Sequence, residues 1–368
     1  MASEVQVLHV AETLIGGIAS HVEDVVRHQI GRYGKENVVV LVPRQHREFV
    51  ASIPDSCVVT FERERRDARA AWHLLSASRR LIASRRPKIV HLHSSVAGGV
   101  VRLLRLMLPL QPGKVVYCPH GWSFAADAAA PRKAAFAAVE RLLSLVTTSI
   151  ITVSDHETSL GRRFGIPARL MTTVYNGVAS SGGASDAPHL PMMDGKLNVL
   201  FVGRLDRQKG FSYVLDAARE LRGKPIQFHV CGSPVVSPAI DFGPIPDNVT
   251  LHGWVKRETV LATMKVADAL VLPSLWEGLS ITGIEAMRAG LPIIASDRSS
   301  NPELIDHCIT GLIVDVGEPG ALSRALSGLT RERLRLMGAQ GQLKFARQFT
   351  LELQVEKLSA LYEAVNAR

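Results

Sequence analysis

Two glutamates eight positions apart, Glu277 and Glu285, form the clearest chemical pattern in the sequence. They lie in Pro273–Gly290 (PSLWEGLSITGIEAMRAG), which joins an expected strand to an expected helix and carries glycines that relax the backbone. Backbone amides there can converge on a diphosphate at the positive end of the helix dipole; they belong to Ser280, Ile281, Thr282 and Gly283. Glu285, expected in the first turn, can bind both hydroxyls of a diol such as ribose. The plain alternative is that Glu285 complements the helix dipole and Glu277 is solvated.

A second group of candidate residues is the basic turn Gly203–Gly210 (GRLDRQKG), which follows an expected strand and precedes an expected helix. Ligands of open parallel sheets bind beyond the carboxyl ends of the strands, so cations in this turn lie where an anionic ligand belongs. Arg204 can hold two phosphate oxygens at once, and Lys209 adds a compact charge. Alone, the turn could be a solvated basic loop; its presence in the same half as the glutamate pair favours a binding site.

The first half contributes glycines and histidines. Gly16 and Gly17 follow the first expected strand and open a helix, so the backbone there can approach an anion closely. His120, in the segment PHGW, follows another expected strand and should project beyond its end, as a catalytic or a structural histidine. His91 and His93 share one face of a strand. Because no third ligand has metal spacing, we interpret this pair as packed or hydrogen-bonded.

Several common signatures are missing. The sequence has no G-x-G-x-x-G that opens a helix, no Walker A segment, no H-E-x-x-H and no D-x-D. Nicotinamide, P-loop and metallopeptidase chemistry therefore lose support, as does a site that holds a diphosphate through a metal bound by D-x-D. Charge on a leaving diphosphate must then be neutralised by cations and helix amides, and we expect no metal and no other cofactor.

The order of apolar runs predicts two α/β domains. Short β-branched runs alternate with helical patterns, which is typical of parallel sheets with right-handed crossovers. We expect a first domain at residues 1–180, a linker of small residues at 181–196, a second domain at 197–350 and a final helix at about 351–368. The strands expected in the first domain are Val5–Val10, Val38–Val42, Ile89–His93, Val115–Cys118, Ile150–Val153 and Thr172–Tyr175, with a helix from Ile18 to about Ile30. Those expected in the second are Leu197–Val202, Gln227–Cys231, Val249–Leu251, Ala269–Leu272, Pro292–Ala295 and Leu312–Val314, with helices at about Phe211–Leu221, Glu258–Val266, Thr282–Ala289 and Ala321–Leu329.

Length and composition are those of a globular enzyme. The 368 residues exceed what one hydrophobic core usually organises, and 46% of them are hydrophobic. Cysteines are scattered, form no C-x-x-C pair and lie mostly in apolar segments; they are Cys57, Cys118, Cys231 and Cys308. We therefore expect reduced core thiols and a cytoplasmic protein. Residues 1–10 lack the features of a signal peptide, and no run approaches the roughly 18 apolar residues that span a bilayer.

The net charge of +9 reflects a run of arginines in the first third, namely Arg63, Arg65, Arg66, Arg69, Arg79, Arg80, Arg85, Arg86, Arg102 and Arg105. Such a face can bind anionic lipid, nucleic acid or a phosphorylated substrate, and a solvated basic face is the plain alternative. Apolar residues at helical spacing favour peripheral contact with the inner face of the plasma membrane over nucleic acid, although the same stripe could face the core. That stripe consists of Trp72, Leu74, Leu75, Leu81 and Ile82.

Taken together, these segments resemble glycosyltransferase family 4, the retaining enzymes of the GT-B fold. The family's motifs E-x7-E, G-R-L-x-x-x-K-G, glycine loop and Asn-Gly before the linker are similar to Glu277 with Glu285, Gly203–Gly210, Gly16-Gly17 and Asn176-Gly177. The segments His91–Gly99 and Val116–Phe124 look like those of bacterial enzymes that build exopolysaccharide or lipopolysaccharide units on lipid carriers. This resemblance implies two Rossmann-like domains whose parallel sheets face a central cleft, with the C-terminal helix crossing back to the N-terminal domain.

The resemblance also implies roles in the second domain. Arg204 and Lys209 would bind the donor diphosphate, Glu285 the ribose hydroxyls and Glu277 the transferred sugar. Backbone of Gly203, Ser280, Ile281 and Thr282 would contribute to the phosphate site.

In the first domain, Gly16 and Gly17 would approach the phosphate, and His120 would orient the sugar and stabilise positive charge at its anomeric centre. The acceptor would attack from the face of the leaving group, and the departing phosphate would help to deprotonate it. No protein nucleophile is then required.

The expected donor is a UDP- or GDP-linked sugar, and the expected acceptor is a glycan or an acceptor carried on a polyprenyl diphosphate. Ser280-Ile281-Thr282 replaces a more usual proline-containing stretch, and Cys231-Gly232-Ser233-Pro234 replaces a glycine-aspartate-glycine turn, so the base and the sugar stay unassigned. Two other classes remain open. A non-catalytic sugar-nucleotide or polyanion-binding protein would bind without product release, and an epimerase or phosphorylase on the same fold would need no acceptor or would use inorganic phosphate.

Overall fold

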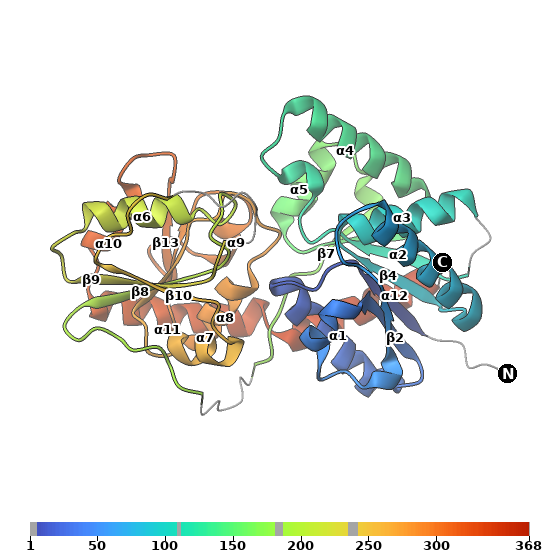
Figure 1. The fold of residues 1–368 in the computed structure, drawn as a ribbon, viewed down its shortest axis with the longest axis horizontal. Coiled ribbons are helices and arrows are strands. Elements are labelled where there is room, and N and C mark those ends of the chain that lie inside the picture. The colour runs from blue at the N-terminus through green and yellow to red at the C-terminus, as the bar shows by residue number, and fades with distance from the viewer. Residues whose placement is uncertain (1–5, 109–111, 181–186, 235–241, 368) are drawn as a thin grey trace. The chain divides into compact units, whose positions relative to one another are not determined.

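The computed structural model describes residues 6–108, 112–180, 187–234 and 242–367 (Figure 1). The chain divides into two compact units. Unit 1 comprises Met1–Gly177 together with Leu351–Arg368, and unit 2 comprises Val178–Thr350. Each unit is built around one parallel sheet flanked by helices, so the α/β architecture expected from the alternation of apolar runs is confirmed.

Unit 1 contains a seven-stranded sheet in the order β3-β2-β1-β4-β5-β6-β7. Its strands are β1 (Val7–Ala11), β2 (Val38–Pro43), β3 (Val58–Phe61), β4 (Ile89–His93), β5 (Lys114–Cys118), β6 (Ser149–Thr152) and β7 (Met171–Thr173). Its helices are α1 (Gly17–Tyr33), α2 (Ala68–Arg85), α3 (Ser95–Met107), α4 (Ala130–Leu143), α5 (Asp155–Arg163) and α12 (Leu351–Asn366), with 3-10 turns at Arg44–Val50, Asp55–Cys57, Ser123–Ala125, Ser144–Val146 and Ala168–Leu170.

Strand β3 was not predicted from the sequence. It lies at the edge of the sheet, where Val58, Val59 and Thr60 are only partly buried. Such a short, half-exposed strand lacks the long apolar run that marks the central strands. The expected strands are present, and their described ends lie within two residues of the predicted ones; Val5 lies outside the described residues.

Unit 2 contains a six-stranded sheet in the order β10-β9-β8-β11-β12-β13. Its strands are β8 (Leu197–Val202), β9 (Ile226–Cys231), β10 (Val249–Gly253), β11 (Ala269–Leu272), β12 (Ile293–Ser296) and β13 (Gly311–Val314). Its helices are α6 (Phe211–Glu220), α7 (Arg257–Met264), α8 (Ile281–Ala289), α9 (Asn301–Leu304), α10 (Ala321–Ser327) and α11 (Arg331–Gln348). Helices α9 and α11 were not predicted.

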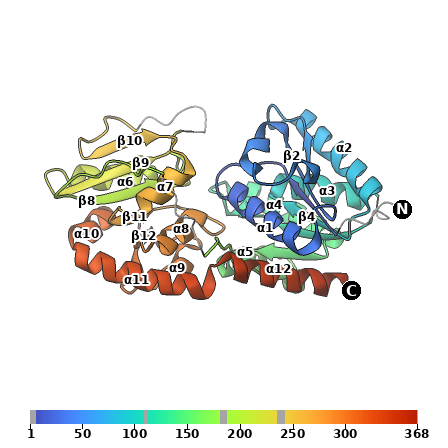
Figure 2. The same ribbon diagram turned by 90° about the horizontal axis from the view of Figure 1, so that it is seen from below.

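The final helix belongs to unit 1 by its contacts. Helix α12 packs on α1, and Figure 2 shows it along that side of the unit. The Oε1 atom of Gln354 accepts the Gly177 backbone N–H at 2.9 Å, and the Tyr362 hydroxyl lies 2.6 Å from His91 Nδ1. Glu363 forms an exposed ion pair with Arg32 at 3.0 Å. The predicted return of the last helix to the N-terminal part of the chain is confirmed.

The two faces of the unit 1 sheet differ in polarity around β4. Val90 and Leu92 point into the apolar core shared with α2 and α3. His91 and His93 alternate with them and therefore lie on the opposite face, the one that α1 and α12 cover. Every residue of β4 is buried; one face of the strand carries Val90 and Leu92, and the other carries His91 and His93.

Three cysteines, Cys57, Cys118 and Cys231, are buried free thiols as expected, whereas Cys308 is exposed and is not a core residue. Of the expected linker, residues 181–186 lie outside the described residues. Residues 187–196 are tied to unit 2: the Leu190 N–H donates to Thr263 Oγ1 at 3.0 Å, and the Met193 N–H donates to Asn198 Oδ1 at 2.8 Å. Within the described ranges, no helix has both the length and the apolar character needed to cross a bilayer.

Candidate functional site

A glycine holds the basic turn after β8 against the loop after β11. Gly210 has a φ of +70°, and a Cβ atom built on it would lie 2.1 Å from the carbonyl oxygen of Pro273. Both the left-handed backbone and the close approach exclude a side chain. Because β8 and β11 are neighbours in the sheet, their carboxyl ends bring this turn beside Glu277.

Lys209 and Glu277 form an ion pair at this edge of the sheet. The Lys209 ammonium donates to Glu277 Oε1, and the two side chains are 19% and 11% exposed. Asp206 supports the pair, because its Oδ1 accepts the Lys209 backbone N–H at 2.9 Å and its Oδ2 lies 3.3 Å from Arg204 Nη2. The structure thus brings three predicted site residues, Arg204, Lys209 and Glu277, into one cluster. An ammonium has three N–H donors, so Lys209 can hold Glu277 and an anion together.

Gln208 connects the two loops and was not predicted as a site residue. Its Oε1 accepts a hydrogen bond from Arg204 Nη2 at 2.5 Å, and its Nε2 donates to the Trp276 carbonyl at 3.0 Å. The Leu275 N–H donates to the backbone carbonyl of Gln208 at 2.8 Å. Gln208 therefore orients the Arg204 guanidinium and fixes the distance between the loops. The only sequence signal for this role was a polar residue inside the basic turn.

Ser299 holds the backbone of Glu277 from a third loop, after β12. Its hydroxyl accepts the Glu277 N–H at 3.0 Å and donates to the Glu277 carbonyl at 2.7 Å. Ser299 has a φ of +56°, which is uncommon for a residue with a side chain and is typical of positions that surrounding structure constrains. Two neighbouring loops therefore fix Glu277, one through its carboxylate and one through its main chain.

Helix α8 begins at Ile281, with Ser280 as its N-cap. The Ser280 hydroxyl accepts the Gly283 N–H at 3.2 Å, so that predicted amide is already paired within the helix cap. Among the described residues, the N–H groups of Ile281 and Thr282 have no hydrogen-bond partner. These two amides form the positive end of the helix. Glu285 is the fifth residue of α8 and lies in the second turn, which corrects the first-turn expectation.

Glu285 is paired with an arginine that the sequence did not reveal. Its Oε1 accepts from Arg257 Nε at 2.9 Å and from Arg257 Nη2 at 2.5 Å. The Glu285 side chain is 8% exposed and that of Arg257 is 45% exposed. Both guanidinium contacts use the same oxygen, so Oε2 remains for a ligand hydroxyl. Arg257 opens α7, 28 residues away, and no local spacing relates it to the glutamate pair.

The predicted glycines have different roles. Gly16 is the N-cap of α1, which begins at Gly17; its φ is +69°, and the space where a Cβ would stand is open. The backbone there is accessible, as an anion site requires. In unit 2 the Gly203 N–H is not free, because it donates to the Cys231 carbonyl at 3.0 Å. A Cβ on Gly232 would lie 1.8 Å from the Gly203 carbonyl oxygen, so Gly203 serves a close backbone crossing.

His120 lies in a left-handed turn just beyond β5, with a φ of +52°. Glu157 of α5 holds this turn, since its Oε1 accepts the Gly121 N–H at 2.6 Å and its carbonyl accepts the Trp122 indole N–H at 2.8 Å. Its Oε2 accepts the Val153 N–H at 2.7 Å, which ties the turn to the end of β6. A strained, partly exposed histidine at the carboxyl end of a parallel strand is in the position expected of a functional residue.

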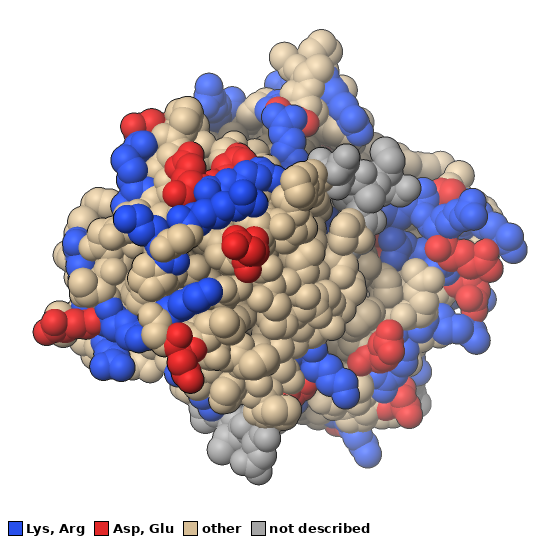
Figure 3. Space-filling model, turned by 60° about the vertical axis from the view of Figure 1, so that its left-hand side comes forward, with Lys and Arg blue, Asp and Glu red and all other residues tan. Residues whose placement is uncertain are grey.

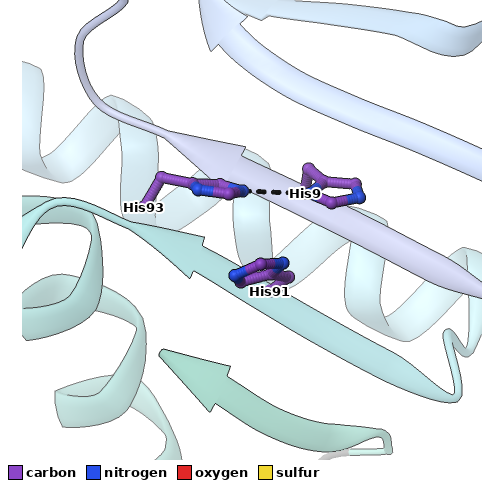
Figure 4. Close-up of side chains that lie close together, drawn as sticks. All are labelled: His9, His91 and His93. Carbon is purple, nitrogen blue, oxygen red and sulfur yellow. Dashed lines mark hydrogen bonds between the residues drawn. The ribbon is translucent and has the colours of Figure 1, made fainter. Parts of the chain in front are cut away.

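Beneath His120 lies a cluster of histidines that the sequence showed only in part. His9 of β1 is paired in register with His91 of β4, and His93 follows on the same face. Figure 4 shows His9, His91 and His93 together, with a hydrogen bond joining His9 to His93. His21 of α1 packs edge-on against His120, with ring centroids 4.6 Å apart. The interpretation of His91 and His93 as hydrogen-bonded is confirmed.

Burial keeps these imidazoles neutral. It lowers the pKa of His9 and of His21 from 6.5 to about 4. The pKa values of His91, His93 and His120 also lie well below the ordinary value, first through burial and then through the neighbouring histidines. Because these residues come from β1, β4, α1 and the turn after β5, only the register of the sheet brings them together.

Two family models together match most of the chain. The model described as Glycosyltransferase Family 4 matches residues 15–181, and the one described as Glycosyl transferases group 1 matches residues 187–342. The chain belongs to glycosyltransferase family 4. The glycine loop and His120 lie in the first matched region, and the basic turn and both glutamates lie in the second.

Curated relatives of this family 4 chain include bacterial proteins that match over most of their own length. A 41.2 kDa protein in the cps region of Klebsiella pneumoniae is 29% identical, over 84% of this chain and 86% of its own. The UDP-Gal:alpha-D-GlcNAc-diphosphoundecaprenol alpha-1,3-galactosyltransferase of Escherichia coli is 25% identical, over 77% of each chain.

Solved structures confirm the GT-B fold. Sucrose-phosphate synthase of Thermosynechococcus elongatus has a TM-score of 0.83 at 18% identity and covers 99% of this chain and 100% of its own. Anabaena HepE in complex with UDP and glucose has a TM-score of 0.76 at 14% identity and covers 98% of this chain and 100% of its own. At these identities the likeness concerns the fold.

Proposed function

We propose that this glycosyltransferase transfers a sugar, with retention of anomeric configuration, from a UDP- or GDP-linked donor to a lipid-linked glycan. The observation that carries the proposal is the cluster of Arg204, Lys209 and Glu277 beyond β8 and β11. It combines two cations for a diphosphate with a carboxylate for sugar hydroxyls, at the edge of a parallel sheet where ligands bind. The donor bound by HepE and the acceptor in the name of the Escherichia coli relative support the same assignment.

The proposed chemistry stabilises the leaving diphosphate without a metal. Arg204 is 33% exposed and offers further N–H donors beyond those held by Gln208 and Asp206. The amides of Ile281 and Thr282 add partial positive charge at the start of α8. Preorganised donors of this kind stabilise charge that develops in the transition state. Glu285, through Oε2, would bind ribose hydroxyls.

In the proposed retaining reaction the acceptor attacks from the face that the diphosphate leaves. The bond from the anomeric carbon to the diphosphate oxygen breaks, the bond to the acceptor oxygen forms, and the departing phosphate takes the acceptor proton. No enzyme nucleophile is needed. His120 of unit 1 would orient the sugar, and the open backbone of Gly16 and Gly17 would approach the phosphate.

A donor panel tests this proposal. Purified protein is given UDP- and GDP-linked sugars with polyprenyl-diphosphate-linked glycans, with and without EDTA, and the product is analysed by mass spectrometry and NMR. We expect transfer from one class of donor, undiminished by EDTA, with the donor's anomeric configuration in the product. Binding without any product would instead indicate a sugar-nucleotide-binding protein. An inverted product or an absolute requirement for a divalent metal would contradict the mechanism.

We also propose that unit 1 contacts the anionic inner face of the plasma membrane, which would place this enzyme in the cytoplasm beside its lipid-linked acceptor. The stripe on α2 is not the contact, because Leu74 and Ile82 are buried and only Trp72 is strongly exposed. Apolar side chains are exposed instead on α3, α4 and the turn after α4; they are Val96, Leu103, Met107, Val139, Leu142 and Leu145. Of the arginine run, Arg63 is 8% exposed and paired with Glu12, whereas Arg79 and Arg80 of α2 are exposed.

Charge is dispersed over the one face that Figure 3 draws. On the face drawn in Figure 3, Lys and Arg side chains are interspersed with Asp and Glu around a broad uncharged area. A mixed surface of this kind has no strong field for an anionic bilayer or for nucleic acid. Helix α3 packs against both α2 and α4, so these helices together combine exposed arginines with exposed apolar residues, which is the composition of interfacial segments.

Vesicle flotation tests the membrane proposal. We expect the protein to float with vesicles that contain phosphatidylglycerol and to stay unbound with phosphatidylcholine alone, because contact needs both charge and apolar insertion. Replacement of Leu142 and Leu145 by serine should weaken flotation, while replacement of exposed Leu336 and Leu343 of α11 in unit 2 by serine should not. Equal binding by both double variants would contradict this surface.

A further inference from the structure

The side chains around His120 form a continuous hydrogen-bonded chain from α1 to the turn after β5. The Gln29 Oε1 atom lies 2.7 Å from His9 Nε2, and His9 Nδ1 lies 2.9 Å from His93 Nε2. His93 Nδ1 in turn lies 3.0 Å from His120 Nε2. Gln29, His9 and His93 are at most 3% exposed, so water does not compete for these bonds.

The position of each proton follows from the first acceptor. An amide oxygen only accepts, so His9 carries its proton on Nε2 and presents a bare Nδ1. His93 must then donate from Nε2 and accept at Nδ1, since a neutral imidazole has one donor and one acceptor. His120 is the last member, and its Nε2 must donate to His93. The chain therefore leaves His120 with a bare Nδ1.

We propose that Gln29, His9 and His93 are positioning residues that hold His120 as a neutral imidazole with its proton on Nε2, so that Nδ1 accepts a hydrogen bond from a hydroxyl of the transferred sugar. This inference rests on the proposed function for the sugar, and on the structure alone for the tautomer. This tautomer fits the proposed reaction, because a neutral imidazole beside the sugar does not oppose positive charge at the anomeric carbon.

The groups that face His120 agree with a neutral ring. His21 of α1 packs edge-on against the His120 ring, and His93 Nδ1 of β4 accepts the hydrogen bond from His120 Nε2. The Cys118 thiol at the end of β5 is buried. The Glu157 carboxylate holds the turn, and its two oxygens accept the amides of Gly121 and Val153. Burial, and then the neighbouring His21, lower the pKa of His120 well below 6.5, and none of the carboxylates in the described part of the chain is bonded to the ring.

His91 lies next to this chain but outside it. It is 1% exposed on the same strand as His93, and its Nδ1 bonds to the Tyr362 hydroxyl at 2.6 Å instead of to His120. Its Nε2 has no hydrogen-bond partner among the described residues. His91 is therefore a matched control, with the same residue type, strand and burial but no bond to His120.

The distance between the His9 and His93 nitrogens favours a direct hydrogen bond over a shared metal ion. His9, His91 and His93 each have a nitrogen within 4.8 Å of the others, which could suit a metal. Two imidazoles on a tetrahedral zinc with Zn–N bonds of about 2.0–2.1 Å hold their nitrogens about 3.3 Å apart. The His9 and His93 nitrogens are 2.9 Å apart with ring planes 16° from parallel, as in a direct hydrogen bond. The His91 ring lies over that of His93, with centroids 4.2 Å apart.

Histidine NMR and kinetics together test the inference. Two-bond ¹⁵N–¹H spectra of the ¹⁵N-histidine-labelled protein, assigned with His120→Gln, report which nitrogen of His120 carries the proton. We expect Nε2–H in the native protein, and a mixture of tautomers in His93→Leu and Gln29→Leu. His93→Gln keeps both a donor group and an acceptor group and should preserve the native pattern, as should His91→Leu.

Transfer activity should follow the tautomer. We expect kcat in His93→Leu to fall on the order of tenfold or more, with a smaller change in the donor KM, because one hydrogen bond to the sugar is lost. His93→Gln and His91→Leu should stay within a few-fold of the native enzyme. Equal losses of kcat in His91→Leu and His93→Leu would show that these histidines act only by packing, and would contradict the inference.

The outcomes separate the two proposals. A native protein with Nδ1–H on His120, or with one equivalent of tightly bound metal by elemental analysis, overturns the tautomer inference whatever the activity. A native protein with the expected tautomer but no turnover of any nucleotide sugar overturns the proposed function and leaves the hydrogen-bonded chain in place.

Discussion

At the scale of single residues, the candidate donor site is a set of charges whose partners were only partly evident in the sequence. Lys209 and Glu277 were both predicted and are paired with each other. Glu285 was predicted, but its partner Arg257 was not. The difference is one of distance along the chain. Lys209 and Glu277 belong to recognisable motifs, whereas the guanidinium of Arg257 reaches Glu285 only because α7 packs beside α8.

Removal of the Arg204 guanidinium tests the charge argument. Arg204→Ala should lower kcat/KM for the nucleotide sugar on the order of 10² or more, because one group that stabilises the leaving diphosphate is lost. Steady-state donor turnover measures this. Arg222→Ala is the matched control, since Arg222 is 59% exposed and follows α6 at the amino ends of the strands. Equal activity of the two variants would argue against a diphosphate at this turn.

At the scale of elements, α11 shows how packing can override local preference. The segment Arg331–Gln348 contains Gly338 and Gly341, which lower helix propensity, and the sequence did not predict a helix there. A Cβ on Gly338 would lie 1.9 Å from the carbonyl oxygen of Gly290, so the glycine lets α11 cross the end of α8 closely. That crossing buries Leu334, Met337 and Phe345, and this burial stabilises the helix.

The two glycines of α11 should therefore respond oppositely to alanine. Gly341→Ala meets no atom closer than 3.8 Å and should raise the free energy of unfolding by roughly 0.5–1 kcal/mol through helix propensity. Gly338→Ala should lower it by 1 kcal/mol or more, on the order of other overpacked sites, because the Gly290 backbone cannot yield. Urea denaturation compares them. A stabilised Gly338→Ala would show that the crossing is not close.

At the scale of the whole molecule, the histidine cluster connects the sheet of unit 1 to its first and last helices. Gln354 Nε2 donates to His21 Nδ1 at 3.0 Å, and Tyr362 bonds to His91. These bonds join α12 to α1 and β4 through buried polar groups, which must find their partners to avoid a desolvation cost. The packing of α12 on unit 1 therefore depends on these specific hydrogen bonds as well as on apolar contacts.

Acid should destabilise this arrangement. The folded pKa values of His9 and His21 are about 4, below the unfolded value of about 6.5, so folding excludes protons that the unfolded chain binds. The stabilising contribution is complete above pH 6.5 and is lost as the pH falls toward 4, by up to about 1.4 kcal/mol per pH unit for each buried histidine. Denaturation midpoints measured between pH 7.5 and 5 should fall accordingly.

His91→Leu provides the comparison for that pH dependence. It removes one buried imidazole whose pKa is lowered well below 6.5, so its stability should decline less steeply between pH 6.5 and 5 than that of the native protein. An unchanged slope would show that this histidine is not kept neutral by folding.

The sequence by itself determined the fold and the motif residues of the candidate donor site. Apolar runs that alternate with helical patterns predict parallel sheets. The spacing from Glu277 to Glu285 and from Gly203 to Gly210 is local, so these motifs can be recognised in the sequence alone. Tertiary structure alone decided the partners of these residues. Arg257 and Ser299 reach Glu285 and Glu277 from distant segments, Gln208 reaches the Trp276 carbonyl of another loop, and His9 meets His93 only because β1 and β4 pair in one particular register. Contacts between distant segments depend on strand order and register, which no local spacing encodes.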